Sequence, residues 1–217
     1  MSDHRLRELQ RRWEVTRSID DEAAVLREAL RIGALDPAHV RLAAMLGHHA
    51  AQLLGMAPSV FPERPTLSDV RESMVPEIVA VGSATVARAT AALLDLIPTE
   101  PNHAERLEQL RALASRFLAG GDEGWEDLTP TGVPVIDAAQ TICLAVRQAL
   151  SDRRPSAAVA RTLTNRVYTF VGEHEGRPKP WATPADVAQL WKARLVPWLL
   201  LGLAFDRPAR RSDEPSS

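Results

Sequence analysis

The 217-residue sequence predicts an all-α fold, built as stacked antiparallel helical hairpins in a helical-repeat-like bundle. Alanine and leucine dominate the segments with helical periodicity, whereas the Val/Ile/Thr alternation typical of strands is scarce. The Asn-Gly and Asp-Gly pairs that mark tight β-hairpins are absent from the sequence. Short segments with proline or glycine instead separate one helical pattern from the next.

The first two helices are expected before Gly33. Leu6, Leu9 and Trp13 fall on one stripe of the first helix, and arginines surround them. Ser18 is a favourable N-cap for the second helix, whose first turn is acidic, as the helix dipole favours. Gly33 can end this helix in the left-handed conformation.

The next stretch again contains residues that begin and end helices. Asp36 is expected to cap a third helix with Pro37 in its first turn, and Gly47 is expected to end it. His48 then opens a short fourth segment. Residues 1–57 are therefore predicted to form an N-terminal helical module.

Three further segments follow this module. Three prolines make residues 58–68 a predicted linker. Residues 69–206 are predicted to form a helical-hairpin domain. Residues 207–217 are polar and rich in serine and proline, which predicts a disordered tail.

A weak internal repeat supports the hairpin layout. The segment VPEIVA at residues 75–80 recurs as VPVIDA at residues 133–138, and each opens a helix through a proline in its first turn. Each is followed by a second helix that starts near a proline, Pro101 or Pro155. The apolar stripes of these second helices are Leu107, Leu110, Ala114 and Phe117 in one, and Val159, Leu163, Val167 and Phe170 in the other. Two such pairs are typical of helical-repeat proteins.

A final helix is expected over residues 184–201, and Pro197 should kink it. Its apolar face consists of Val187, Trp191, Leu195 and Trp198.

Composition limits the classes of function. The formal net charge is −2, which gives no overall attraction to nucleic acid or to a membrane. The charged N-terminus does not resemble a secretory signal, and the most apolar stretch, residues 195–205, is far shorter than the roughly 20 residues of a membrane-spanning helix. The single cysteine, Cys143, excludes an intramolecular disulfide. These features together predict a cytoplasmic protein that does not bind a membrane.

The motifs of common enzyme classes are absent from the sequence. It contains no zincin, P-loop, dinucleotide-binding or nucleophile-elbow pattern, and one cysteine cannot form a CxxC zinc site. Cys143 shares a predicted apolar stripe with Ile136, Ala139 and Leu150, which favours a core position. We therefore predict no catalytic residue, no cofactor and no metal.

Two adjacent histidines, His48 and His49, are the first candidates for a metal site. Neighbouring side chains on a helix point about 100° apart, so these two cannot readily chelate one ion. A metal site would need His39, His103 or His174 brought close by the fold. A capping or packing role is the more frequent use of such residues.

An acidic loop between the two predicted helix pairs is the main candidate for binding a partner. Asp122, Glu123, Glu126 and Asp127 surround Trp125, and no basic residue lies between them. Aromatic residues are enriched at the centres of interfaces, so this loop could contact a basic protein. The alternative is that Trp125 folds onto the core while the acids face water.

Two other classes of function stay open. An enzyme or small-molecule binder would place a pocket between helices, with His48, Glu173 and His174 as its polar groups. A DNA-associated regulator would use the basic first helix, which carries Arg5, Arg7, Arg11, Arg12 and Arg17. Nucleic acid is disfavoured because Glu8 and Glu14 interrupt this basic helix.

Two parts of the sequence resemble known families. The stretch LRELQRRWEVTRSIDDEAAVLREALRIGALDPAHVRLAAMLGHHAAQLLG resembles an N-terminal helical module of an uncharacterised bacterial all-helical family, through its Arg12–Trp13 pair, its acidic cap and its LREALRIGALDP junction. The helical rhythm of the later part resembles helical-repeat immunity proteins, which inhibit bacterial toxins. The resemblance implies a non-enzymatic protein-interaction protein with one protein partner.

Overall fold

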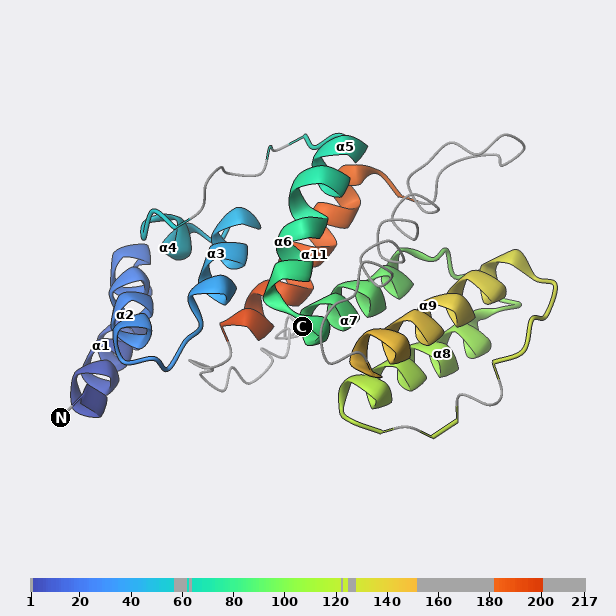
Figure 1. Cartoon of the computed structure of the whole chain (residues 1–217), viewed down its shortest axis with the longest axis horizontal. Helices are drawn as coiled ribbons and strands as arrows, with labels where there is room; N and C mark the ends of the chain where they lie inside the picture. The colour runs from blue at the N-terminus through green and yellow to red at the C-terminus, as the bar shows by residue number, and fades with distance from the viewer. Residues whose placement is uncertain are drawn as a thin grey trace, which may run out of the picture.

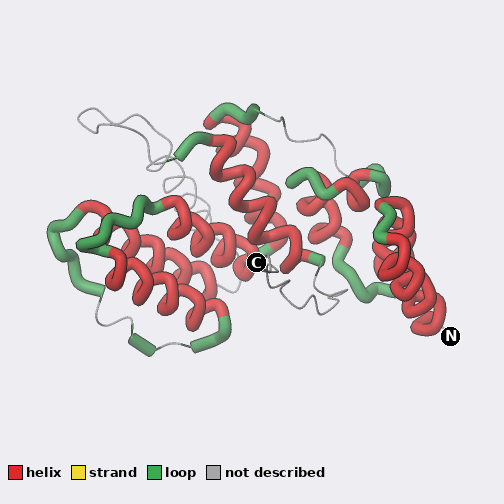
Figure 2. The backbone as a smooth tube through the Cα atoms, turned by 180° about the vertical axis from the view of Figure 1, so that it is seen from behind, coloured by secondary structure: helices red, strands yellow, loops and turns green. Residues whose placement is uncertain are grey.

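The computed structural model describes residues 2–56, 62, 64–121, 123–124, 128–151 and 182–200. These residues form helices and loops and contain no strand, which confirms the all-α fold for this part of the chain (Figures 1 and 2). Within the same ranges, no helix is both long and apolar enough to cross a bilayer.

The first two helices, α1 (Ser2–Thr16) and α2 (Ile19–Arg31), pack together as predicted. Leu6 and Trp13 are buried on the face of α1 that meets the core, because they lie on the predicted stripe. The Ser18 hydroxyl accepts a hydrogen bond from the Asp21 amide at 3.1 Å, which confirms the predicted N-cap.

Two buried carboxylates on α2 hold α1 in place. Asp21 accepts a hydrogen bond from the Thr16 hydroxyl at 2.6 Å and lies 2.8 Å from the guanidinium Nε of Arg12. Glu28 pairs with Arg31 on its own helix and lies 3.9 Å from Nε of Arg5. The hydrogen bonds from Thr16 and Arg31 lower the pKa values of Asp21 and Glu28, respectively, and the nearby arginines lower them further.

We expect the α1–α2 contact to weaken in acid. Both carboxyl pKa values are lowered by folding, so their stabilisation is present above the unfolded pKa of about 4 and is lost as the pH falls below it. The free energy of unfolding, measured with denaturant, should therefore decrease between about pH 5 and pH 3. Asp21→Asn should reduce this pH dependence, whereas Asp20→Asn, which changes an exposed acid on the same helix, should leave it nearly intact. An equal pH dependence in wild type and Asp21→Asn would contradict the role of Asp21.

The next helices also begin where the sequence predicts. In α3 (Pro37–Met45), the Asp36 side chain accepts from the Ala38 amide at 2.8 Å. A short helix, α4 (His49–Gln52), follows Gly47, which has a left-handed φ of 84°.

The segment after α4 forms a continuous helical stretch of three parts. These are α5 (Leu67–Asp69), the π-helical turn η1 (Val70–Met74) and α6 (Val75–Val81). Thr66 and Asp69 form a capping box at its start. The helix therefore begins within the last two residues of the predicted 58–68 linker, while residues 57–61 and 63 lie outside the described part of the chain.

The second half of the described chain contains α7 (Ser83–Ala92), the 3₁₀ turn η2 (Leu93–Leu96), α8 (Ala104–Leu118), α9 (Pro134–Ser151) and α11 (Pro184–Leu199). Helices α7 and α8 are antiparallel, as the predicted hairpin requires (Figure 1). The colour gradient runs in the same direction along α8 and α9, which contact each other, so these two neighbours are parallel (Figure 1). The predicted partner of α9, at residues 154–173, lies outside the described residues, so the repeat stays a prediction.

The core contains the predicted stripes of α8 and α11, with one correction on α9. The stripe of α8 is buried throughout, as are Val187, Trp191 and Leu195 on α11, whereas Trp198 of the same predicted face is only half-buried. Ile136, Ala139 and Cys143 are also buried, but Leu150 is 37% exposed because it lies at the end of α9 and turns away from the core. The prediction that Leu150 shares the buried stripe was therefore wrong.

The N-terminal helices pack against the later ones through α3, which contacts α6 and α11. Arg41 on α3 donates to the Glu77 carboxylate on α6 at 2.7 Å. The ring of His39 lies 5.6 Å from the ring of Trp198 on α11, measured between centroids. Residues of α3 thus help to fix the end of α11, which forms one wall of the groove described below.

Candidate functional site

The predicted acidic loop is only partly described by the structure. Glu123 is exposed, whereas Asp122, Trp125, Glu126 and Asp127 lie outside the described residues. The proposal that this loop binds a basic partner therefore stays a prediction.

The histidine pair has a structural role at the start of α4. His48 Nδ1 accepts a hydrogen bond from the Ala51 amide at 3.3 Å, and Nε2 lies 3.4 Å from the Glu22 carboxylate on α2. His48 therefore caps α4 and connects it to α2, which confirms the capping interpretation. Glu173 and His174 lie outside the described residues. In the part of the chain that is described, no group of three or more His, Cys, Asp and Glu side chains could hold a metal ion.

Cys143 lies fully buried on α9, where the Sγ atom is 3.3 Å from the Leu110 carbonyl oxygen that accepts its hydrogen bond. Burial raises the pKa of this thiol to about 12. The thiol is thus protonated at neutral pH and cannot act as a nucleophile there. This agrees with the predicted core position.

Three of the basic residues in and just after the first helix contact α2 or Trp13. Arg12 and Arg5 face the buried carboxylates described above. Arg17, in a left-handed conformation with φ of 53°, places its guanidinium over the Trp13 ring at 4.7 Å. These contacts favour a structural use of the basic residues that the sequence offered as a nucleic-acid contact.

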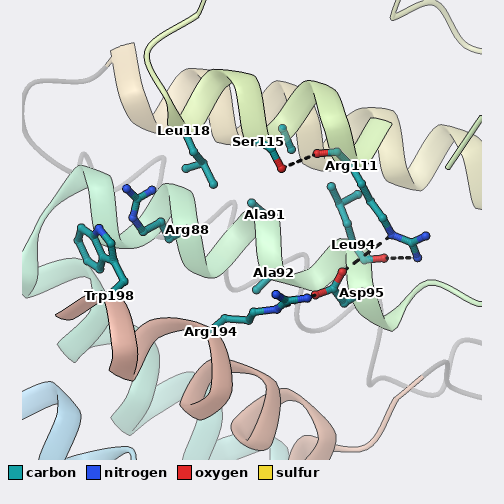
Figure 3. Close-up of a pocket in the computed structure, with 11 residues that line it drawn as sticks. Arg88, Ala91, Ala92, Leu94, Asp95, Arg111, Ser115, Leu118, Arg194 and Trp198 are labelled. Atoms are coloured by element: carbon teal, nitrogen blue, oxygen red, sulfur yellow. Dashed lines mark hydrogen bonds and ion pairs between the residues drawn. The ribbon is translucent and has the colours of Figure 1, made fainter. Parts of the chain in front are cut away.

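The candidate site is a groove of about 290 Å³ between α7, η2, α8 and α11 (Figure 3). We call it the cationic groove, because three arginines and only one carboxylate line it. Its lining consists of Arg88, Ala91, Ala92, Leu94, Asp95, Arg111, Ala114, Ser115, Leu118, Arg194 and Trp198.

Helix packing explains why this space exists. The antiparallel helices α7 and α8 face each other through small side chains, Ala91 and Ala92 on one and Ala114 on the other. Alanine leaves room between the helices that a leucine would fill. Helix α11 crosses the open side and contributes Arg194 and Trp198 (Figure 3).

Asp95 is the centre of the ion pairs at one end of the groove. Arg194 donates from two guanidinium nitrogens to one Asp95 oxygen, at 2.9 and 2.6 Å. Arg111 Nε lies 3.9 Å from the other Asp95 oxygen. Arg111 is held in addition by the Leu94 carbonyl at 3.2 Å and by Glu108 at 3.4 Å. Both arginines therefore already have carboxylate partners.

Arg88 occupies the other end of the groove, where its guanidinium has no carboxylate partner among the described residues. Its guanidinium lies 4.5 Å from the centroid of the Trp198 ring, and its Nε is buried without a hydrogen-bond acceptor. Burial alone lowers the pKa of this group, and no described carboxylate forms an ion pair with it. A half-buried guanidinium with an unused donor is an unsatisfied cation that an anionic group would stabilise.

Sequence reasoning did not identify this groove. Arg88 lies in the alanine-rich segment VARATAALL, and its isolated charge among small apolar residues was the one available signal. Arg111 and Arg194 belong to other helices, and neither has a local motif that connects it with Arg88.

Comparisons with protein-family models, with curated proteins and with solved structures each gave no match to this chain. The groove and its charges are therefore the basis on which a function is assigned.

Proposed function

We propose that this chain is a non-enzymatic protein-interaction protein, and that the cationic groove holds an acidic side chain of one protein partner. The observation that carries the proposal is Arg88, which is half-buried, stacked on Trp198 and without an ion-pair partner among the described residues. A carboxylate from a partner at this guanidinium would balance the charge.

The residue types of the groove support a protein partner. Arginine and tryptophan are the residues most enriched among interface hot spots, where a few desolvated side chains carry most of the binding free energy. Arg88 and Trp198 form such a pair, and Leu118 supplies an apolar edge beside them (Figure 3).

The resemblance to immunity proteins gives the proposal a concrete form. The partner would be a bacterial toxin domain that this chain binds and blocks. The acidic loop around Trp125 would then be a second contact, with basic residues of the same partner. Opposite charges at two surfaces would orient the partner as well as bind it.

The test is affinity capture of the tagged full-length chain from its source cells, followed by calorimetry with the purified partner. We expect one stoichiometric protein partner. Arg88→Ala should weaken its binding by about 30-fold or more, because truncating a hot-spot residue costs about 2 kcal/mol. Arg27→Ala, which removes an exposed arginine on α2, is the matched control and should bind as wild type does.

Arg88→Lys separates charge from geometry, since lysine keeps the charge but lacks the planar fork. We expect this variant to lose part of the affinity. Circular dichroism and a denaturant titration of each variant establish that the fold is intact. The proposal is wrong if no protein partner is captured, or if folded Arg88→Ala binds the partner as tightly as wild type does.

A small-molecule binder is the second candidate, and the size of the groove favours it. Ligand pockets are typically about 300–1,000 Å³, and the cationic groove, at about 290 Å³, is close to the lower limit of that range. It would suit a small carboxylate ligand. Its polar groups are arginines and an aspartate, and the predicted His48 is not among its lining residues.

A further inference from the structure

The charges of the cationic groove are unevenly compensated. Arg194 and Arg111 both point toward Asp95, and Arg111 also lies 3.4 Å from Glu108 (Figure 3). Arg88 has no such partner in the described ranges, and its contact with Trp198 supplies no full negative charge. The groove therefore offers one uncompensated positive charge, although three arginines line it.

Asp95 is the residue that reduces the number of uncompensated arginines in the groove. It lies on η2, two helical turns beyond Arg88 on the same side of the α7–η2 stretch, and it faces the groove. Its side chain engages guanidinium groups from α8 and α11 that could otherwise turn toward a ligand at Arg88. Without this carboxylate, Arg194 and Arg88 would both lack a carboxylate partner, whereas Arg111 would keep Glu108, and the groove would attract a more highly charged group.

We infer that the cationic groove selects the carboxylate side chain of an Asp or Glu residue over a phosphorylated side chain, and that Asp95 is the residue that determines this specificity. A carboxylate carries one negative charge and fits the two-pronged geometry of one guanidinium. A phosphoserine carries about −1.5 to −2 at pH 7, and its additional charge would meet no free cation, because Asp95 engages Arg194 and Arg111. The inference deepens the proposed function and rests on it, because it names the chemical group that the partner presents.

The experiment uses blocked amino acids as probes, so that the selectivity is tested without the partner. The ¹⁵N-labelled full-length protein is titrated with N-acetyl-glutamate amide and with N-acetyl-phosphoserine amide at pH 7 and constant ionic strength. The neutral control is N-acetyl-glutamine amide. The signal is the Nε–H resonance of Arg88, identified by its absence from the spectrum of Arg88→Lys.

We expect the glutamate probe to shift this resonance saturably at a concentration at least threefold lower than the phosphoserine probe needs. The glutamine probe should give no saturable shift. In Asp95→Asn, the freed Arg194 should reduce this preference at least threefold or reverse it. If that variant does not fold, Arg194→Gln replaces it, and the less compensated Asp95 should then weaken glutamate binding at Arg88.

Several outcomes would overturn the inference. These are equal or tighter binding of the phosphoserine probe by wild type, no shift with either anionic probe, an unchanged preference in folded Asp95→Asn, or unchanged glutamate binding in Arg194→Gln where that variant is used. The failure of the proposed function gives a different result. In that case the glutamate preference is observed, but Arg88→Ala leaves binding of the captured protein unaffected.

Discussion

Replacing Trp191 by alanine should destabilise the protein by about 3–5 kcal/mol, the range seen when a large buried aromatic side chain is truncated. Trp191 on α11 is fully buried, and its indole N–H donates to the Ala89 carbonyl on α7 at 2.9 Å. The substitution removes the apolar contacts of the ring and also leaves that buried carbonyl without its indole donor. Chemical denaturation, read by far-ultraviolet circular dichroism, measures the loss as a lower midpoint with a similar slope.

Two controls separate the contributions at this position. Trp191→Phe keeps an aromatic ring but lacks the N–H donor, so it should cost less than the alanine variant. Trp198→Ala truncates the same residue type on the same helix at a half-buried position, and it should cost clearly less than Trp191→Ala. If truncation at the two positions costs the same, Trp191 does not have the central role in packing that its burial indicates.

Gly82→Ala is the second substitution with a large expected effect, a loss of about 1–3 kcal/mol. Gly82 separates α6 from α7 and has φ of 134° and ψ of 174°, a backbone conformation that residues with a Cβ atom rarely adopt. A Cβ atom at this position would meet no other atom within 4 Å, so the cost comes from backbone strain and not from a clash. The free energy of unfolding from denaturant titrations measures this strain.

Gly33→Ala is the matched control for this prediction. Gly33 has φ of 72°, and a Cβ atom there would also meet nothing within 4 Å. The left-handed region near this φ is open to other residues at a cost of about 1 kcal/mol, as Arg17 shows in this chain at φ of 53°. Gly82→Ala should therefore destabilise more than Gly33→Ala, and the reverse order would show that the conformation at Gly82 is not strained for alanine.

The cationic groove also depends on Gly82. Helix α7 carries both Arg88 and the small residues that leave the groove open, and its direction relative to α6 is set at this glycine. The sequence pattern predicted a helix that opens at Pro76 and indicated no break at Gly82. Because apolar residues continue on both sides of the glycine, periodicity alone does not reveal the change of direction.

The sequence by itself determined the helices and most of their buried faces. Ser18 and Asp36 cap helices through hydrogen bonds to amides two or three residues away, so their role depends on neighbours in the chain. The same holds for His48, which caps α4, and for the stripe of α8, which is buried as its spacing predicts. These features are local, because caps and apolar stripes depend only on residues within one or two turns of the same helix.

The tertiary structure alone decided the parallel arrangement of α8 and α9 and the existence of the cationic groove. Arg88, Asp95 and Arg194 line the same groove because α7 and α11 pack together, and 99 residues separate the ion-paired Asp95 and Arg194 in the sequence. No periodicity or capping pattern contains information on such a pair, since it depends on how whole helices pack. Helix packing also explains why Asp95 has an ion-pair partner, Arg194, whereas Arg88, two turns earlier, has none among the described residues. Arg88 is therefore the one available cation among the described residues of the groove.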